Sequence, residues 1–62
     1  MENYNRIEKD KDGTYYYLNG KYHRLDGPAK KHPNGDKEWW QNGKLSRIDG
    51  PAIEYANGRT LS

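Results

Sequence analysis

The residues of this sequence that are equipped for chemistry are arginines and aspartates that recur in pairs. Arg24 and Asp26 lie in one Arg-x-Asp-Gly-Pro-Ala segment, and Arg47 and Asp49 lie in a second. A guanidinium group binds phosphates and carboxylates through a bidentate fork, so Arg24 and Arg47 are candidates for a row that binds an anion. Alternatively, each arginine forms an ion pair with its own aspartate, which stabilises a surface by about 0–1 kcal/mol. The sequence leaves both interpretations open.

Metal binding and catalysis find little support in the sequence. His23 and His32 are the only histidines, there is no cysteine, and no carboxylate cluster accompanies the histidines. A metal site needs several converging ligands, and a nucleophilic serine needs a base that is oriented by a third group. The glycines are isolated rather than grouped in a phosphate-binding loop. The sequence therefore predicts a non-enzymatic protein without a metal or another cofactor.

The glycines indicate which elements position these side chains. Seven glycines recur at intervals of seven or eight residues, and each one follows Asn or Asp. Asn-Gly and Asp-Gly are the preferred pairs in tight hairpin turns, where the backbone adopts positive φ, whereas frequent glycine disfavours helices. The pattern predicts an all-β antiparallel meander of seven or eight short strands. The expected strands are residues 4–9, 14–18, 21–25, 29–32, 36–41, 44–48, 52–55 and 59–61.

The chain also repeats itself. Residues 19–29 return as residues 42–52 at an offset of 23, and residues 1–18 resemble a degenerate half-copy. Self-similarity at a fixed period is typical of repeat architectures, in which each unit buries its apolar face against its neighbours. We therefore expect a single domain, residues 1–62, built from about two and a half repeats of 23 residues.

The repeated pattern aromatic-x-Asn-Gly-Lys-x-His-Arg-x-Asp-Gly-Pro-Ala resembles MORN-type repeats, which have a similar length and consist of β-hairpins. It is most similar to the MORN-variant repeats with a His-Arg-x-Asp-Gly-Pro-Ala signature, common in proteins of bacteriophages and large DNA viruses. The resemblance covers residues 15–61, with Ser46 in place of the histidine in the second copy. It implies a viral protein that binds and inhibits a host factor, such as a defence component, in the host cytoplasm.

Two-residue turns at the Asn-Gly pairs would decide which side chains share a face, because side chains alternate along a strand. The resulting cross-strand pairs are Tyr17–Tyr22, Trp40–Leu45, Ala29–Trp40, Lys31–Glu38 and Glu54–Leu61. One predicted face carries Tyr15, Tyr17, Tyr22, Ala29, Trp40, Leu45, Ala52 and Leu61. The other carries Tyr16, His23, Leu25, Trp39, Ile48, Ile53 and Tyr55. Apolar patches on both faces favour a partner or self-association, so we expect a homo-oligomer.

The two tryptophans are consecutive and point to opposite faces of one strand. Trp40 lies opposite Leu45 in the predicted pairing, which assigns it to the packed side. Trp39 has little apolar cover, and tyrosine and tryptophan are enriched at interface hot spots. The predicted protein-binding residues are Tyr16, His23, Trp39 and Tyr55.

Nucleic acid or a small anionic ligand, bound through arginine and tyrosine side chains, is the alternative to a protein partner. Eleven basic residues and eight aromatic residues are compatible with stacking on single strands. However, nine acidic residues are interleaved with the basic ones, and no basic run exceeds Lys30-Lys31-His32. There is also no long apolar run and no polybasic segment, so we expect a cytoplasmic protein that does not bind membranes.

Overall fold

The computed structural model describes residues 3–61, and these residues form nine short strands and no helix. The all-β class is therefore confirmed, and every predicted strand region contains a strand. Residues 36–41 divide into two strands at Trp39. The strands are β1 (Arg6–Asp10), β2 (Gly13–Leu18), β3 (Lys21–Tyr22), β4 (Lys30–Lys31), β5 (Lys37–Glu38), β6 (Trp40–Gln41), β7 (Lys44–Leu45), β8 (Ile53–Glu54) and β9 (Thr60–Leu61).

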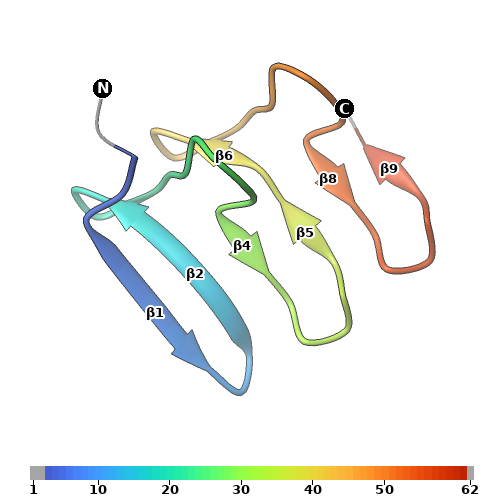
Figure 1. The fold of residues 1–62 in the computed structure, drawn as a ribbon, viewed down its shortest axis with the longest axis horizontal. Helices are drawn as coiled ribbons and strands as arrows, with labels where there is room; N and C mark the ends of the chain where they lie inside the picture. The colour runs from blue at the N-terminus through green and yellow to red at the C-terminus, as the bar shows by residue number, and fades with distance from the viewer. Residues whose placement is uncertain (1–2, 62) are drawn as a thin grey trace.

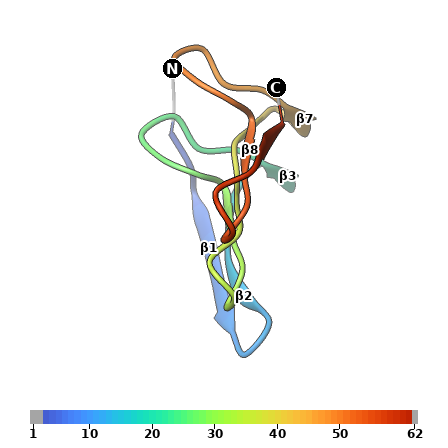
Figure 2. The ribbon, with the colours of Figure 1, turned by 90° about the vertical axis from the view of Figure 1, so that its right-hand side faces the viewer.

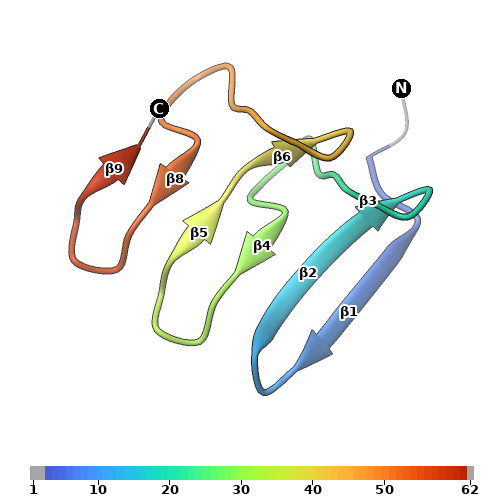
Figure 3. The same cartoon turned by 180° about the vertical axis from the view of Figure 1, so that it is seen from behind.

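The strands form a thin antiparallel plate with extents of 31 × 28 × 15 Å. Its main sheet has the order β1-β2-β4-β5-β8-β9, with β3 attached to β2, and β6 and β7 form a separate hairpin (Figure 1). Seen edge-on, the loops at residues 24–28 and 47–51 project to one side of the plate, and β3 and β7 lie on the other (Figure 2). We call these sides the loop face and the hairpin face. The hairpin face is toward the viewer in Figure 3.

The pairing register repeats at the offset seen in the sequence. Thr14 pairs with Lys31 in the β2–β4 ladder, and 23 residues later Lys37 pairs with Glu54 in the β5–β8 ladder. The β4–β5 pairing recurs in the same way as the β8–β9 pairing. Each repeated segment thus occupies an equivalent place in the sheet, and the hairpins succeed one another along the plate.

Two of the four Asn-Gly turns have the predicted geometry. Asn19 and Asn42 adopt φ values of 52° and 53°, and the glycine after each also has positive φ. Positive φ at both central residues is the signature of a type I′ turn. The predicted pairs Tyr17–Tyr22 and Trp40–Leu45 are accordingly present.

At the other two turns the predicted register is wrong by one residue. Lys31 pairs with Lys37 instead of Glu38. In this turn the N–H of Gly35 donates to the carbonyl of His32, and Gly35 alone adopts positive φ. The proline at position 33 fixes a negative φ, which suits a type I turn followed by a glycine bulge. This loop has one residue more than a type I′ turn.

The turn before β9 repeats this geometry, so Glu54 pairs with Thr60 rather than with Leu61. A shift of one residue reverses the face of every side chain in a strand. The carboxylate of Glu54 reaches Arg47 on the loop face, which places its neighbours Ile53 and Tyr55 on the hairpin face. The predicted face of Ile53 and Tyr55 is therefore wrong. The predicted face of Ala29 and Ala52 is also wrong, because each lies one residue before a hairpin-face residue and so points to the loop face.

The core is very small. The buried residues within the described chain are Ala29, Ala52, Gly13 and His23, and the His23 side chain is completely buried. The prediction that His23 belongs to an accessible binding surface is wrong, because the next hairpin covers it. There the backbone N–H of Asn42 donates to His23 Nδ1 at 3.0 Å.

Candidate functional site

The first loop is organised around the guanidinium group of Arg24. Its Cζ lies 4.0 Å from the ring centroid of Tyr16, within cation–π range. Its Nε donates to Asp26 at 2.8 Å, and one terminal nitrogen donates to the carbonyl of Pro28 at 3.4 Å. Hydrogen bonds from Asn3 and from Arg24 lower the pKa of Asp26 below its ordinary value. The arginine therefore fastens the loop to the sheet.

The second loop has the same arrangement with one additional ion pair. Arg47 Cζ lies 3.8 Å from the Trp39 ring centroid, and the guanidinium donates to Asp49 at 3.2 Å and to the carbonyl of Pro51 at 3.2 Å. It also donates to Glu54 at 2.8 Å. The hydrogen bond to Glu54 raises the pKa of Arg47 above its ordinary value.

The glycines of the two Asp-Gly-Pro segments lie close to the guanidinium groups of these arginines. Neither Gly27 nor Gly50 has positive φ, so they are not the hairpin glycines that the sequence predicts. A Cβ atom at Gly27 would lie 3.0 Å from the Cζ of Arg24, and one at Gly50 would lie 2.9 Å from the Cζ of Arg47. The absence of a side chain at these two glycines therefore leaves room for each guanidinium close to the backbone.

A groove of about 560 Å³ separates the two loops. Its lining residues are Arg24, Leu25, Asp26, Gly27, Trp39, Gln41, Arg47, Ile48 and Asp49. Ile48 is 92% exposed, and the Asp26 and Asp49 side chains are 61% and 86% exposed, whereas those of the arginines are 16% and 20% exposed. A ligand in the groove would therefore first meet aliphatic side chains and carboxylates.

The structure brings together only part of the predicted protein-binding set. Tyr16 and Trp39 lie on the loop face beneath the two arginines. Tyr55 is 40% exposed on the opposite face, and His23 is buried. The exposed aliphatic residues of the groove, Leu25 and Ile48, were not predicted as site residues. The sequence feature that could have identified them is that Leu25 and Ile48 occupy equivalent positions in the two copies of the repeat.

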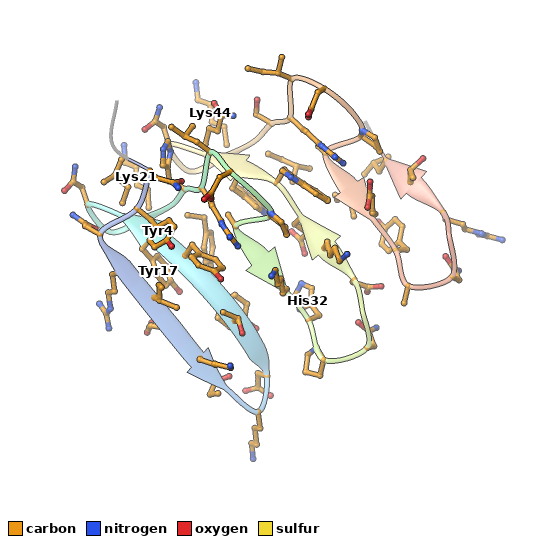
Figure 4. All side chains as sticks on the ribbon, viewed as in Figure 1. Tyr4, Tyr17, Lys21, His32 and Lys44 are labelled. Carbon is orange, nitrogen blue, oxygen red and sulfur yellow. The ribbon has the colours of Figure 1, made fainter. Side chains whose placement is uncertain are left out.

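Tyr4 also escaped the prediction. Its ring packs edge-on against Tyr16 with centroids 4.8 Å apart, and the guanidinium of Arg24 lies 5.8 Å from it. Figure 4 shows Tyr4 beside the first hairpin, and Lys21 and Lys44 at equivalent places on the two hairpins. The N-terminal segment therefore completes the loop face next to the groove.

The hairpin face carries a packed aromatic cluster. Tyr22 stacks on Tyr17 at 5.0 Å and lies 5.5 Å from Trp40, as the assignment of Trp40 to a packed side requires. The ammonium of Lys30 lies 4.6 Å from the Tyr22 ring centroid. Burial, together with a hydrogen bond to Tyr22, raises the pKa of Tyr17 to about 12.

The carboxylate of Glu38 connects this aromatic cluster to His32, which follows β4. Glu38 accepts a hydrogen bond from Trp40 Nε1 at 3.0 Å and lies 2.8 Å from His32 Nε2. Burial by itself raises the pKa of Glu38, but the bonds from His32 and Trp40 and the charge of Lys30 outweigh it, so the pKa lies below its ordinary value.

No group of three or more potential metal ligands occurs among residues 3–61. The described part of the chain also has no helix suited to crossing a lipid bilayer. No protein-family model, curated protein or solved structure matches the chain.

Proposed function

We propose that the chain is a non-enzymatic interaction module that binds a protein partner in the groove between its two loops. The observation that carries this proposal is the exposure of Ile48, 92% of which is open to solvent at the mouth of the groove. Leu25 is exposed at the equivalent place in the first loop. Both side chains line the same groove, and apolar side chains that share one exposed surface are typical of sites that a partner covers.

The chemistry of the rim indicates which partner segment fits. The exposed carboxylates of Asp26 and Asp49 flank the aliphatic residues, so an extended segment with apolar side chains between lysines or arginines complements the groove. The resemblance to viral repeat proteins supports a host protein as the source of this segment. Binding would then inhibit a host factor in the host cytoplasm.

Binding of an anion through Arg24 and Arg47 is the second candidate, because both arginines border the groove. It has less support, since each guanidinium already donates to a carboxylate and to a backbone carbonyl. The two aspartates separate the two candidates. Asp26→Asn with Asp49→Asn should weaken the binding of a basic segment and should strengthen the binding of an anion.

Variants of the groove test the proposal. Immobilised wild-type protein should capture a specific protein from a host lysate, and Ile48→Asp should abolish that capture. Ile7→Asp is the matched control, because Ile7 is 51% exposed on β1 and does not line the groove. Equal capture by the wild type and by the folded Ile48→Asp variant would contradict the proposal.

A further inference from the structure

The loop face carries a row of lysines that crosses four strands of the main sheet. Residues directly opposite one another in an antiparallel pair lie on the same face. Lys9 on β1 pairs with Thr14 on β2, and Thr14 also pairs with Lys31 on β4. Lys31 in turn pairs with Lys37 on β5. Glu54 continues the row on β8, and its carboxylate lies on the loop face. We call Lys9, Lys31 and Lys37 the lysine row.

The direct pairing of Lys31 with Lys37 disfavours the fold, because like charges opposite each other destabilise an antiparallel pair. The ion pairs among residues 3–61 are made by arginines and a histidine, and none includes a lysine. Glu54, which pairs with Lys37 on the other side, is already bonded to Arg47 at 2.8 Å. The lysine row is therefore a line of cations without carboxylate partners in the described part of the chain.

The second copy of the repeat shows which contact the first copy lacks at position 31. By the offset of 23 residues, Lys31 occupies the place of Glu54, and Arg24 occupies the place of Arg47. Arg47 donates to Glu54 at 2.8 Å, whereas Arg24 cannot form the equivalent ion pair with a lysine. Lysine at this position thus removes an attraction and adds a repulsion. Departures from the locally stabilising choice are expected at functional sites, and the group that would compensate this one is an anion.

We propose that the lysine row binds the phosphodiester backbone of a nucleic acid. From β1 to β5 the row spans three strand spacings, about 14 Å in total, which suits several successive phosphates rather than one. Lysine binds phosphate as a point charge, and Thr14 within the row offers a hydroxyl donor. The aromatic rings of this face, Tyr16 and Trp39, are covered by arginines. We therefore expect binding through phosphates alone, without preference for a base sequence.

The shape of the loop face favours a polymer strand over a lipid surface. The loops at residues 24–28 and 47–51 project from the same side of the plate as the lysine row (Figure 2). Their exposed aspartates would meet an anionic bilayer first and repel it, whereas a strand can lie beside the loops. None of the three lysines lines the groove, so this proposal does not rest on the proposed function.

Fluorescence anisotropy of labelled DNA at increasing salt tests the proposal, with an oligothymidine and a duplex of equal length as probes. Binding of either probe supports it. The wild type should bind with a Kd of about 1–100 μM at about 50 mM salt. For three phosphate contacts to a single strand, the logarithm of the association constant should fall with the logarithm of the salt concentration at a slope of about −2.

Two double variants of equal net charge separate the lysine row from a general effect of charge. Lys31→Gln with Lys37→Gln should bind about 2- to 30-fold more weakly, as the loss of two exposed ion pairs predicts, and the slope should fall to about −0.7. The matched control is Lys21→Gln with Lys44→Gln, on β3 and β7 of the hairpin face (Figure 4). This control should keep the slope of the wild type.

Lys31→Glu separates binding from folding. It introduces the residue of the second copy, so an ion pair with Arg24 should raise the midpoint of thermal unfolding while the affinity for DNA falls. Ile48→Asp should leave DNA binding unchanged, because it alters the groove only.

The proposal is overturned if the wild type binds neither probe, if the two double variants lose affinity equally, or if Lys31→Glu lowers the midpoint of unfolding. Displacement of the DNA by inorganic phosphate at constant ionic strength would also overturn it, in favour of a site for a single phosphate. So would lysine-dependent binding to vesicles of phosphatidylserine and phosphatidylcholine in the absence of DNA binding.

Discussion

At the scale of single residues, each guanidinium in the two loops combines an aromatic ring below, a carboxylate beside it and a backbone carbonyl at the end of the loop. These contacts need a planar cation with several fixed donors, which arginine provides and lysine does not. The chain has little other means of holding these loops, because its buried residues are small apart from His23. The arginines are therefore structural supports for the groove.

Replacement of Arg47 by lysine should lower the free energy of unfolding by about 1–2 kcal/mol. The variant loses the stacking on Trp39 and the simultaneous hydrogen bonds to Asp49 and Glu54, while it keeps the charge. Denaturant titration followed by tryptophan fluorescence measures the change. Arg6→Lys is the control, because the Arg6 side chain is 68% exposed, and it should change stability by less than about 0.5 kcal/mol. Equal effects of the two substitutions would contradict the structural role of Arg47.

At the scale of elements, the chain uses Asn-Gly in two different turns. The two-residue turns occur where a hairpin must bend back tightly on the hairpin face, and the longer turns with a glycine bulge lie at the opposite end of the main sheet. The conformation of the asparagine distinguishes them, since only Asn19 and Asn42 have positive φ among the non-glycine residues described.

Gly43→Val should destabilise the protein by more than about 1 kcal/mol, because a β-branched residue is strained at the observed φ of 77°. Thermal unfolding measured by circular dichroism tests this. Lys44→Val, one residue further along, introduces the same side chain on an exposed strand with ordinary φ and should change stability much less. A Gly43→Val protein as stable as wild type would exclude the type I′ assignment.

The hydrogen bond between Glu38 in β5 and Trp40 in β6 should make the free energy of unfolding depend on pH in the acidic range. The folded pKa of Glu38 lies below its ordinary value of 4.5, so the folded state favours the carboxylate. This contribution is fully present above about pH 4.5 and is lost as the pH falls through the lower folded pKa. Unfolding midpoints in urea at pH 3–6 should therefore drop at the acidic end. Glu38→Gln should reduce that drop, and an unchanged pH profile in this variant would contradict the assignment.

At the scale of the whole molecule, a plate 15 Å thick cannot enclose its aromatic residues. The described chain buries two alanines, a glycine and one histidine, and its tyrosines and tryptophans remain partly exposed on both faces. Small domains of this kind often gain stability from association. This favours a partner-dependent or self-associating protein.

We expect sedimentation at micromolar concentration to give a dimer or larger species. The aromatic cluster of the hairpin face supplies the apolar surface, and salt should affect the association little. Tyr22→Lys, which places a charge within that cluster, should shift the population toward monomer. A clean monomer of 7.3 kDa with well-dispersed amide signals would contradict this expectation and leave the aromatic surfaces to other partners.

The sequence alone determined the features that depend on local backbone chemistry. Asn-Gly and Asp-Gly at regular intervals predict short antiparallel strands, because these pairs accept conformations that other residues resist. The offset of 23 predicts equivalent places in the sheet, and the ladders have that offset. The opposite facing of Trp39 and Trp40 also follows from strand alternation.

Only the tertiary structure decided the features that depend on register and on neighbouring layers. One extra loop residue after His32 reverses the face of Ala29, and the equivalent loop after Tyr55 does the same for Ile53. The pairing rule assumes a two-residue turn, so it cannot predict a shift that a longer loop causes. His23 is buried because another hairpin, 19 residues further along the chain, donates to it. Each arginine already has hydrogen-bond partners, because the Asp-Gly-Pro segment forms a loop around its guanidinium rather than a hairpin turn. These contacts exist only when the loop packs against the sheet.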